Sequence, residues 1–180
     1  MKDEPLSNET TGAALPLPTC IIVYTDGSCQ PNPGRGGYAA ILCRYRDGRE
    51  IKRAHIYGCK QRTTNNEMEM RAAVEALQLI KKGEKMPAYI RSDSKYLIDG
   101  KNEWLPGWIT KGWRKADGKE PENVALWREI VELCDGLDVT FEWVRGHSDD
   151  RMNAEADQLA AKGRAQRKPR VIEVMEGELA

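Results

Sequence analysis

The hydrophobic pattern of the chain begins with an uninterrupted apolar run at residues 21–24, which leads directly into Asp26 and Gly27. Consecutive apolar residues of mainly β-branched and aromatic type are typical of a strand that is buried on both faces. Strand-like runs follow at residues 38–45 and 50–57, and the Asp-Gly pair between them favours a tight hairpin turn. The pattern therefore predicts three consecutive antiparallel strands at the start of the fold.

Helical periodicity then begins at Thr64 and predicts a helix that ends near residue 82. Thr64 with Glu67 three residues later matches a capping box. The face of this helix that must pack on the sheet carries Ala72, Ala73, Ala76, Leu77 and Ile80. Glu69 falls on the same face, where a carboxylate is costly unless it is paired or bound to a metal. A first-turn glutamate favoured by the helix dipole is an equally good interpretation of this residue alone.

A fourth strand is predicted at residues 88–93, followed by a short helix that Ser94 would cap. Because a helix separates this strand from the first one, the two should lie parallel. Asp26 and Asp93 would then meet at one edge of the sheet, where two carboxylates repel each other unless a cation lies between them. Taken singly, Asp26 fits a turn and Asp93 fits a helix N-terminus, and each of these roles is common.

Residues 101–119 are rich in both cations and aromatic side chains. Five lysines or arginines stand against two acids in this segment, with Trp104, Trp108 and Trp113 between them. Such a composition suits contact with the phosphate backbone of a nucleic acid. The alternative is a helix packed by its tryptophans and solubilised by its lysines, and the residues alone favour nucleic-acid contact only slightly.

The remaining pattern predicts a helix at about residues 122–133, a strand at 138–145 and a helix at about 151–162. His147 lies in the loop before the last helix and is a candidate for chemistry. His55 lies within the third predicted strand, and we interpret it as an idle surface residue.

The last predicted helix carries a further carboxylate, Asp157. Asp149 or Asp150 is expected to cap this helix. Asp157 shares its helix face with Ala154, Ala160 and Ala161, which places another carboxylate on a packing face. Four carboxylates at two strand ends and two inward helix faces together favour a Mg²⁺ site, because this ion prefers oxygen ligands. Two such ions about 3.5–4 Å apart would clamp the oxygens of a phosphoryl displacement.

Composition limits the binding partners and the cellular compartment that this protein can have. The chain has 180 residues, enough for one domain, and its 28 basic and 28 acidic residues give a net charge of zero. Any binding to nucleic acid must therefore come from a local patch. The five cysteines are odd in number and form no C-x-x-C pair, which argues against disulfides or a zinc site and favours a reducing compartment. We find no signal-peptide pattern and no apolar run of membrane-spanning length, and expect a cytoplasmic protein.

The domain boundaries follow from the same patterns. Residues 1–18 are polar with Pro and Gly and are expected to form a disordered tail. Residues 19–163 hold all the predicted elements and are expected to form one domain, and residues 164–180 are expected to be a C-terminal tail. A monomer is expected.

Four blocks of the sequence resemble bacterial-type ribonuclease HI. They are YTDGSC at residues 24–29 with NPG at 32–34, TTNNEME at 63–69, SDSKY at 92–96, and WVRGH at 143–147 continuing through Asn153 to Asp157. The resemblance runs in order from about residue 21 to residue 162. It implies an α/β, ribonuclease H-like fold: a mixed five-stranded sheet, with three antiparallel strands then two parallel to the first, flanked by helices.

The resemblance also implies roles for individual residues. The metal-binding catalytic carboxylates would be Asp26, Glu69, Asp93 and Asp157. His147 would assist product departure or proton transfer. The residues that would contact the substrate are Asn32, Asn65 and Lys95 near the cut, Arg62, Thr64 and Asn123 around a DNA-strand phosphate, and Trp104, Lys111, Arg114 and Lys115 on a basic protrusion.

The implied reaction is endonucleolytic hydrolysis of the RNA strand of an RNA–DNA hybrid. Two Mg²⁺ ions would serve as cofactors, with Mn²⁺ as a possible substitute, and the products would carry 3′-hydroxyl and 5′-phosphate ends. A DNA nuclease of the same fold is a second hypothesis, and a catalytically inactive hybrid-binding module is a third. The Asn-rich helix start and the Gly-His loop argue against the second, and the presence of all four carboxylates argues against the third.

Overall fold

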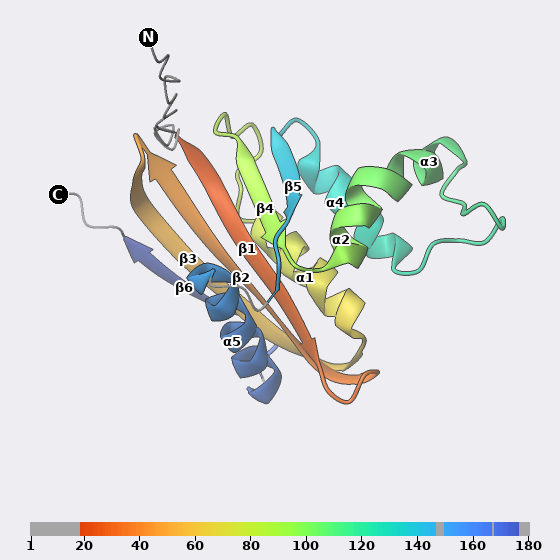
Figure 1. Ribbon diagram of the computed structural model, residues 1–180, viewed down its shortest axis with the longest axis horizontal. Coiled ribbons are helices and arrows are strands. Elements are labelled where there is room, and N and C mark those ends of the chain that lie inside the picture. The colour runs from red at the N-terminus through yellow and green to blue at the C-terminus, as the bar shows by residue number, and fades with distance from the viewer. Residues whose placement is uncertain (1–18, 147–149, 167, 177–180) are drawn as a thin grey trace, which may run out of the picture.

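A mixed six-stranded sheet forms the centre of the structure (Figure 1), a computed structural model that describes residues 19–146, 150–166 and 168–176. The strands are β1 (Cys20–Cys29), β2 (Gly34–Arg46), β3 (Arg49–Thr63), β4 (Ala88–Ser92), β5 (Val139–Trp143) and β6 (Val171–Glu176). They lie in the order β5-β4-β1-β2-β3-β6. As predicted, β1, β2 and β3 are antiparallel neighbours, and β4 and β5 run parallel to β1.

Helices cover both faces of this sheet. They are α1 (Asn65–Leu77), α2 (Lys95–Asp99), α3 (Leu105–Thr110), α4 (Val124–Cys134) and α5 (Arg151–Ala165), with a π-helical turn at Gly100–Trp104 between α2 and α3. Figure 1 shows α5 on one face of the sheet and α1 on the other. Among the described residues, no helix combines the length and the apolar character that crossing a membrane requires.

The central strand β1 is buried on both faces, as its apolar run predicted. Ile21 and Val23 point into the larger core with α1 and α4, whereas Ile22 and Tyr24 point into the smaller core with α5. Burial of such side chains stabilises the fold by roughly 1.5–3 kcal/mol each. The strand that carries Asp26 is therefore fixed from both sides.

The sixth strand corrects the predicted strand count and the predicted C-terminal tail. β6 lies within residues 164–180 and pairs antiparallel with β3, from Lys52 opposite Glu176 to Tyr57 opposite Val171. It is an edge strand whose side chains stay largely exposed, with Val174 at 53 %. Backbone hydrogen bonds hold such a strand without a buried apolar face, which is why the hydrophobic pattern did not identify it.

Helix α1 ends earlier than its periodicity predicted. Regular helix stops at Leu77, and the next residues form tighter turns in which Leu79 and Ile80 donate to carbonyls three residues back. Ile80 remains buried on the face that continues the helical stripe. The apolar pattern therefore extended past the end of the helix itself.

Candidate active site

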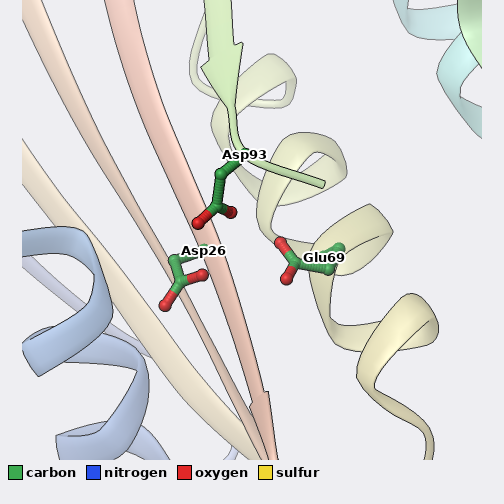
Figure 2. A group of neighbouring side chains, drawn as sticks. All are labelled: Asp26, Glu69 and Asp93. Atoms are coloured by element: carbon green, nitrogen blue, oxygen red, sulfur yellow. The ribbon is translucent and has the colours of Figure 1, made fainter. Parts of the chain in front are cut away.

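Three carboxylates from three different elements converge where β4 ends beside β1 (Figure 2). Asp26 lies on β1, Glu69 lies in the first turns of α1, and Asp93 directly follows β4. Each residue offers one oxygen atom that lies within 4.8 Å of those of the other two. The parallel register explains why the two aspartates lie close together. Thr25 pairs with Ser92, and the residue that follows each of them is an aspartate. The predicted side-by-side placement of Asp26 and Asp93 is thus confirmed.

The backbone at Gly27 lets α1 approach β1 closely enough to deliver Glu69. A Cβ atom at Gly27 would lie 2.5 Å from the backbone nitrogen of Glu69 and 2.9 Å from the carbonyl carbon of Met68. Because β1 continues through Asp26 and Gly27 to Cys29, the interpretation of this Asp-Gly pair as a turn is wrong. Ser94 caps α2 by accepting from the Leu97 backbone N–H (3.3 Å), so the helix-cap role belongs to Ser94 and not to Asp93.

Electrostatics at this cluster favour a bound cation. Burial, followed by the charges of Asp93 and Asp157, raises the pKa of Asp26 to about 8. Burial, followed by the charges of Asp26 and Asp93, raises the pKa of Glu69 well above its ordinary value. Asn65 donates to one Glu69 oxygen (3.3 Å), whereas the other is buried and has no hydrogen-bond partner among the described residues. A set of oxygen ligands with an unpartnered buried carboxylate oxygen fits Mg²⁺ or Mn²⁺.

Asp157 of α5 lies on the cavity beside this cluster, but not on the predicted packing face of its helix. Its side chain is exposed, as is that of Ala154, so the face they share is not the packing face. The residues that α5 buries are Asn153, Ala156, Leu159, Ala160 and Gly163. Asp157 instead lines the same cavity of about 430 Å³ as the three clustered carboxylates, and its charge and a hydrogen bond both raise the pKa of Asp26.

Asp150 is one of the two residues that were predicted to cap α5. Asp150 caps the helix by accepting from the backbone N–H groups of Met152 (2.9 Å) and Asn153 (3.3 Å). His147 and Asp149 lie outside the described residues, so the role predicted for His147 is not tested.

The other histidine is not an idle surface residue, contrary to prediction. The side chain of His55 is 13 % exposed, and its Nε2 atom lies 3.1 Å from an oxygen of Glu155 on α5. Arg53, also on β3, lies 3.6 Å from the other oxygen of the same carboxylate. Burial lowers the pKa of His55 below its ordinary value. These contacts attach α5 to β3.

The residues predicted to contact substrate near the cut lie around the cluster. Asn65 and Lys95 line the same cavity as the carboxylates. Asn32 accepts from the Asn65 backbone N–H (3.2 Å) and so supports the start of α1. Thr64 accepts from the Glu67 N–H (3.2 Å), which confirms the helix cap.

The capping box itself is only half formed. Instead of reaching back to Thr64, the Glu67 carboxylate accepts from the Thr63 hydroxyl (2.7 Å) and pairs with Lys60. The predicted reciprocal bond is replaced because β3 runs on to Thr63 and supplies nearer donors.

The predicted phosphate pocket is divided between two parts of the fold. Arg62 and Thr64 lie at the junction of β3 and α1, whereas Asn123 precedes α4 in a left-handed conformation (φ 56°). The amide nitrogen of Asn123 donates to the Tyr96 hydroxyl (3.3 Å). Helices α1 and α4 pack against each other in the larger core, but joint binding of one phosphate by these three residues stays a prediction.

Two tryptophans of the protrusion, Trp104 and Trp108, pack against neighbouring aromatic rings, whereas the Trp113 ring faces the guanidinium of Arg128. Ring pairs at 5.7–5.9 Å link Tyr96, Trp104, Trp108 and the fully buried Trp127. Trp104 is 38 % exposed and borders a groove with Lys115. The packing of these tryptophans is confirmed, and Trp104 is also exposed beside Lys115. Contact of this segment with a nucleic acid stays a prediction. Lys111 and Arg114 are exposed, and Arg114 donates to the Gly118 carbonyl (3.4 Å) within the same segment.

Two residues of the site were not singled out from the sequence. Tyr96 connects the cavity to the aromatic cluster, and its hydroxyl donates to the Glu122 carbonyl (3.1 Å). Asn153 is 5 % exposed, lines the cavity near Asp157, and has an amide oxygen without a hydrogen-bond partner among the described residues. Both residues lie inside the sequence blocks that resemble ribonuclease HI, and this position is the signal that could have identified them.

Comparisons with known proteins place the chain in a family. A family model for RNase H matches residues 18–165. Ribonuclease H of Cupriavidus pinatubonensis is 42% identical over 143 residues, which are 79% of this chain and 94% of that protein. Ribonuclease H of Francisella tularensis subsp. novicida is 45% identical over 146 residues, which are 81% of this chain and 91% of that protein.

Solved structures show the same fold. LC9-RNase H1, a type 1 RNase H, superimposes with a TM-score of 0.74 at 31% identity, over 84% of this chain and 75% of that chain. LC11-RNase H1 in complex with an RNA/DNA hybrid superimposes with a TM-score of 0.58 at 23% identity, over 81% and 96% of the two chains, and shows the fold alone. The family match and the two curated relatives together establish that this chain belongs to the RNase H family of nucleases.

Proposed function

We propose that the protein is an endonuclease that hydrolyses the RNA strand of RNA–DNA hybrids. The single observation that carries this proposal is the convergence of Asp26, Glu69 and Asp93, whose ligand oxygens lie within 4.8 Å of one another, with Asp157 on the same cavity. The structure of LC11-RNase H1 with a bound RNA/DNA hybrid supports the class of substrate.

Two divalent metal ions, Mg²⁺ with Mn²⁺ as a substitute, would be held by the four carboxylates. When bound, such ions supply an activated water and neutralise charge that develops on the phosphate. The protein contributes a rigid cage: adjacent parallel strands fix Asp26 and Asp93, and the close approach of α1 at Gly27 fixes Glu69. Because burial and mutual repulsion penalise the charged carboxylates, the cage favours a cation before the substrate arrives.

Hydrolysis would proceed by in-line attack of water on the phosphorus. The new bond joins the water oxygen to phosphorus, and the bond to the 3′ oxygen of the preceding nucleotide breaks. The products then carry 3′-hydroxyl and 5′-phosphate ends. His147 is assigned to proton transfer or product departure, and its support is the match of the Gly-His loop to the family pattern.

Substrate recognition would divide between the two strands. Asn32, Asn65 and Lys95 would contact the hybrid near the cut, where 2′-hydroxyl groups distinguish RNA from DNA. The residues that would contact the DNA strand are Arg62, Thr64 and Asn123 at a phosphate, and Trp104, Lys111, Arg114 and Lys115 along the protrusion. The support for this division is that Asn65 and Lys95 line the carboxylate cavity, whereas Trp104 and Lys115 border a separate groove.

One experiment tests the proposal. RNA–DNA hybrid, double-stranded RNA and double-stranded DNA of one sequence are each incubated with the protein in Mg²⁺ or in EDTA. We expect cleavage of the RNA strand of the hybrid alone, and only with Mg²⁺. Equal cleavage of double-stranded RNA would refute the proposed specificity, and cleavage of double-stranded DNA would favour a DNA nuclease of the same fold.

A further inference from the structure

The segment that follows α5 contacts both helices that carry active-site carboxylates. Residues 168–176, here called the C-terminal clamp, lie beyond residue 165, where the match to the RNase H family model ends. The clamp runs along the outer edge of β3 and ends as strand β6 (Figure 1). The residues of the clamp therefore lie outside the matched family pattern.

On one face of the sheet, the clamp reaches α1. The Nε atom of Arg170 lies 2.7 Å from an oxygen of Glu75, which is on the same helix as Glu69 and is 9 % exposed. A buried carboxylate is costly without a cation, so this contact couples the clamp to the position of α1. Just before Arg170, the Pro169 carbonyl accepts from the buried Tyr38 hydroxyl (2.9 Å).

On the opposite face, the clamp reaches α5. Glu173 accepts from the Tyr57 hydroxyl (2.6 Å) and lies 3.6 Å from the ammonium group of Lys162. Lys162 lies on α5, the helix of Asp157, and its ammonium group stands 4.5 Å from the centre of the Tyr57 ring. Glu173, Tyr57 and Lys162 thus form one group of contacts that joins the clamp, β3 and α5.

The close approach of these elements depends on Gly58 of β3. A Cβ atom at Gly58 would lie 2.0 Å from the Pro169 carbonyl oxygen, and one at Gly163 of α5 would lie 2.5 Å from the Gly58 carbonyl oxygen. The clamp and α5 therefore pack directly on the same stretch of β3 backbone. Such backbone contact leaves little freedom for either element to shift.

We propose that the C-terminal clamp is a positioning element that fixes the spacing between α1 and α5, and through them the spacing between Glu69 and Asp157. The two helices lie on opposite faces of the sheet, and Figure 2 shows Asp26 between them. Arg170 attaches the clamp to one helix and Glu173 attaches it to the other. This inference rests on the proposed function, since the carboxylates matter only if they hold metal together.

The test compares variants that release one helix or both with a matched control. Arg170→Met removes the cation beside Glu75, and Glu173→Gln keeps an acceptor for Tyr57 but removes the charge that attracts Lys162. The control is Glu176→Gln, which breaks the exposed pair with Lys52 (2.8 Å) on the same strand and leaves the contacts of Arg170 and Glu173 in place. Mg²⁺ affinity is measured by calorimetry on the full chain, at a temperature where circular dichroism shows each variant folded.

We expect the double variant Arg170→Met/Glu173→Gln to bind Mg²⁺ about 2- to 30-fold more weakly, the range that corresponds to couplings of about 0.5–2 kcal/mol. Arg170→Lys should restore most of the affinity lost in Arg170→Met, and the control should match wild type. The Mg²⁺ concentration for half-maximal hybrid cleavage should rise in parallel with the dissociation constant.

A double variant that melts lower but binds Mg²⁺ within about twofold of wild type would overturn the proposal, because the clamp would then contribute only stability. The same conclusion would follow if the Glu176→Gln control weakened Mg²⁺ binding as much as the double variant. A wild-type protein that binds no Mg²⁺ would refute the proposed function itself. If the double variant fails to fold, the single Glu173→Gln variant gives the same comparison with a smaller perturbation.

Discussion

Replacing Asp93 by asparagine should separate the electrostatic cost of the carboxylate cluster from its metal-binding role. The ligand oxygens of Asp26 and Asp93 lie within 4.8 Å of each other, and at 4.8 Å two ionised carboxylates repel by about 3.5 kcal/mol if the effective dielectric constant is about 20. The pKa of Asp26 is raised to about 8, so the metal-free protein avoids this cost at pH 6 by keeping that residue protonated. Stability linked to this proton falls as the pH rises above 3.8, the ordinary pKa of an aspartate, and is lost by about pH 8. The metal-free Asp93→Asn variant should therefore be more stable than wild type at pH 9, by up to about 3.5 kcal/mol, and close to wild type at pH 6.

The same variant should lose its response to metal. A metal that binds only the folded state stabilises it by about 2.7 kcal/mol at a hundredfold excess over Kd, which corresponds to a rise in Tm of about 5–11 °C for a chain of this size. Wild type should show that shift in Mg²⁺, whereas Asp93→Asn should lose most of it and show no detectable cleavage. Thermal melts at both pH values, with Mg²⁺ or EDTA, provide the measurement. A variant that melts lower than wild type without metal and still cuts hybrid would refute this reasoning.

Three further predictions concern binding, proton transfer and pH. Neutralising Lys111, Arg114 and Lys115 should lower the salt slope of log K for hybrid by up to about 2–3 with little change in saturated turnover; an unchanged slope would assign these residues to solvation alone. His147→Ala should reduce kcat by about 10²–10⁴-fold, and a loss as complete as that of a carboxylate variant would show a larger role. Because the pKa of Asp26 is raised to about 8, Mg²⁺ binding below pH 8 should displace a proton, so affinity should increase from pH 6 to 8. Calorimetry in buffers of different ionisation enthalpy measures that release, and a pH-independent affinity would contradict it.

The sequence predicted the carboxylate cluster because its geometry follows from local rules. An apolar run buried on both faces fixed β1 in the middle of the sheet, and the intervening helix required β4 to be parallel to it. Once those strands are neighbours, Asp26 and Asp93 must emerge together. The helical stripe then placed Glu69 on the buried face of α1, where the structure has it at 4 % exposure.

Features that depend on tertiary contacts between polar groups could not be predicted from the sequence. His55 reads as a surface residue in a strand, and only the packing of α5 on β3 shows its contact with Glu155. Asp157 lines the cavity of the carboxylates, but it was predicted on the wrong helix face, since alanines occur on both the buried and the exposed sides of α5. β6 carries no turn signal or buried face, so its pairing with β3 became visible only from backbone geometry.

The most direct test of the metal cage is anomalous scattering from crystals of the protein with hybrid and Mn²⁺. Manganese takes the oxygen ligands that suit magnesium and gives a measurable anomalous signal. We expect anomalous peaks in contact with the carboxylates of Asp26, Glu69 and Asp93, and a peak that also contacts Asp157. Crystals in which hybrid occupies the cavity and is cut, with no anomalous peak at these carboxylates, would contradict this expectation.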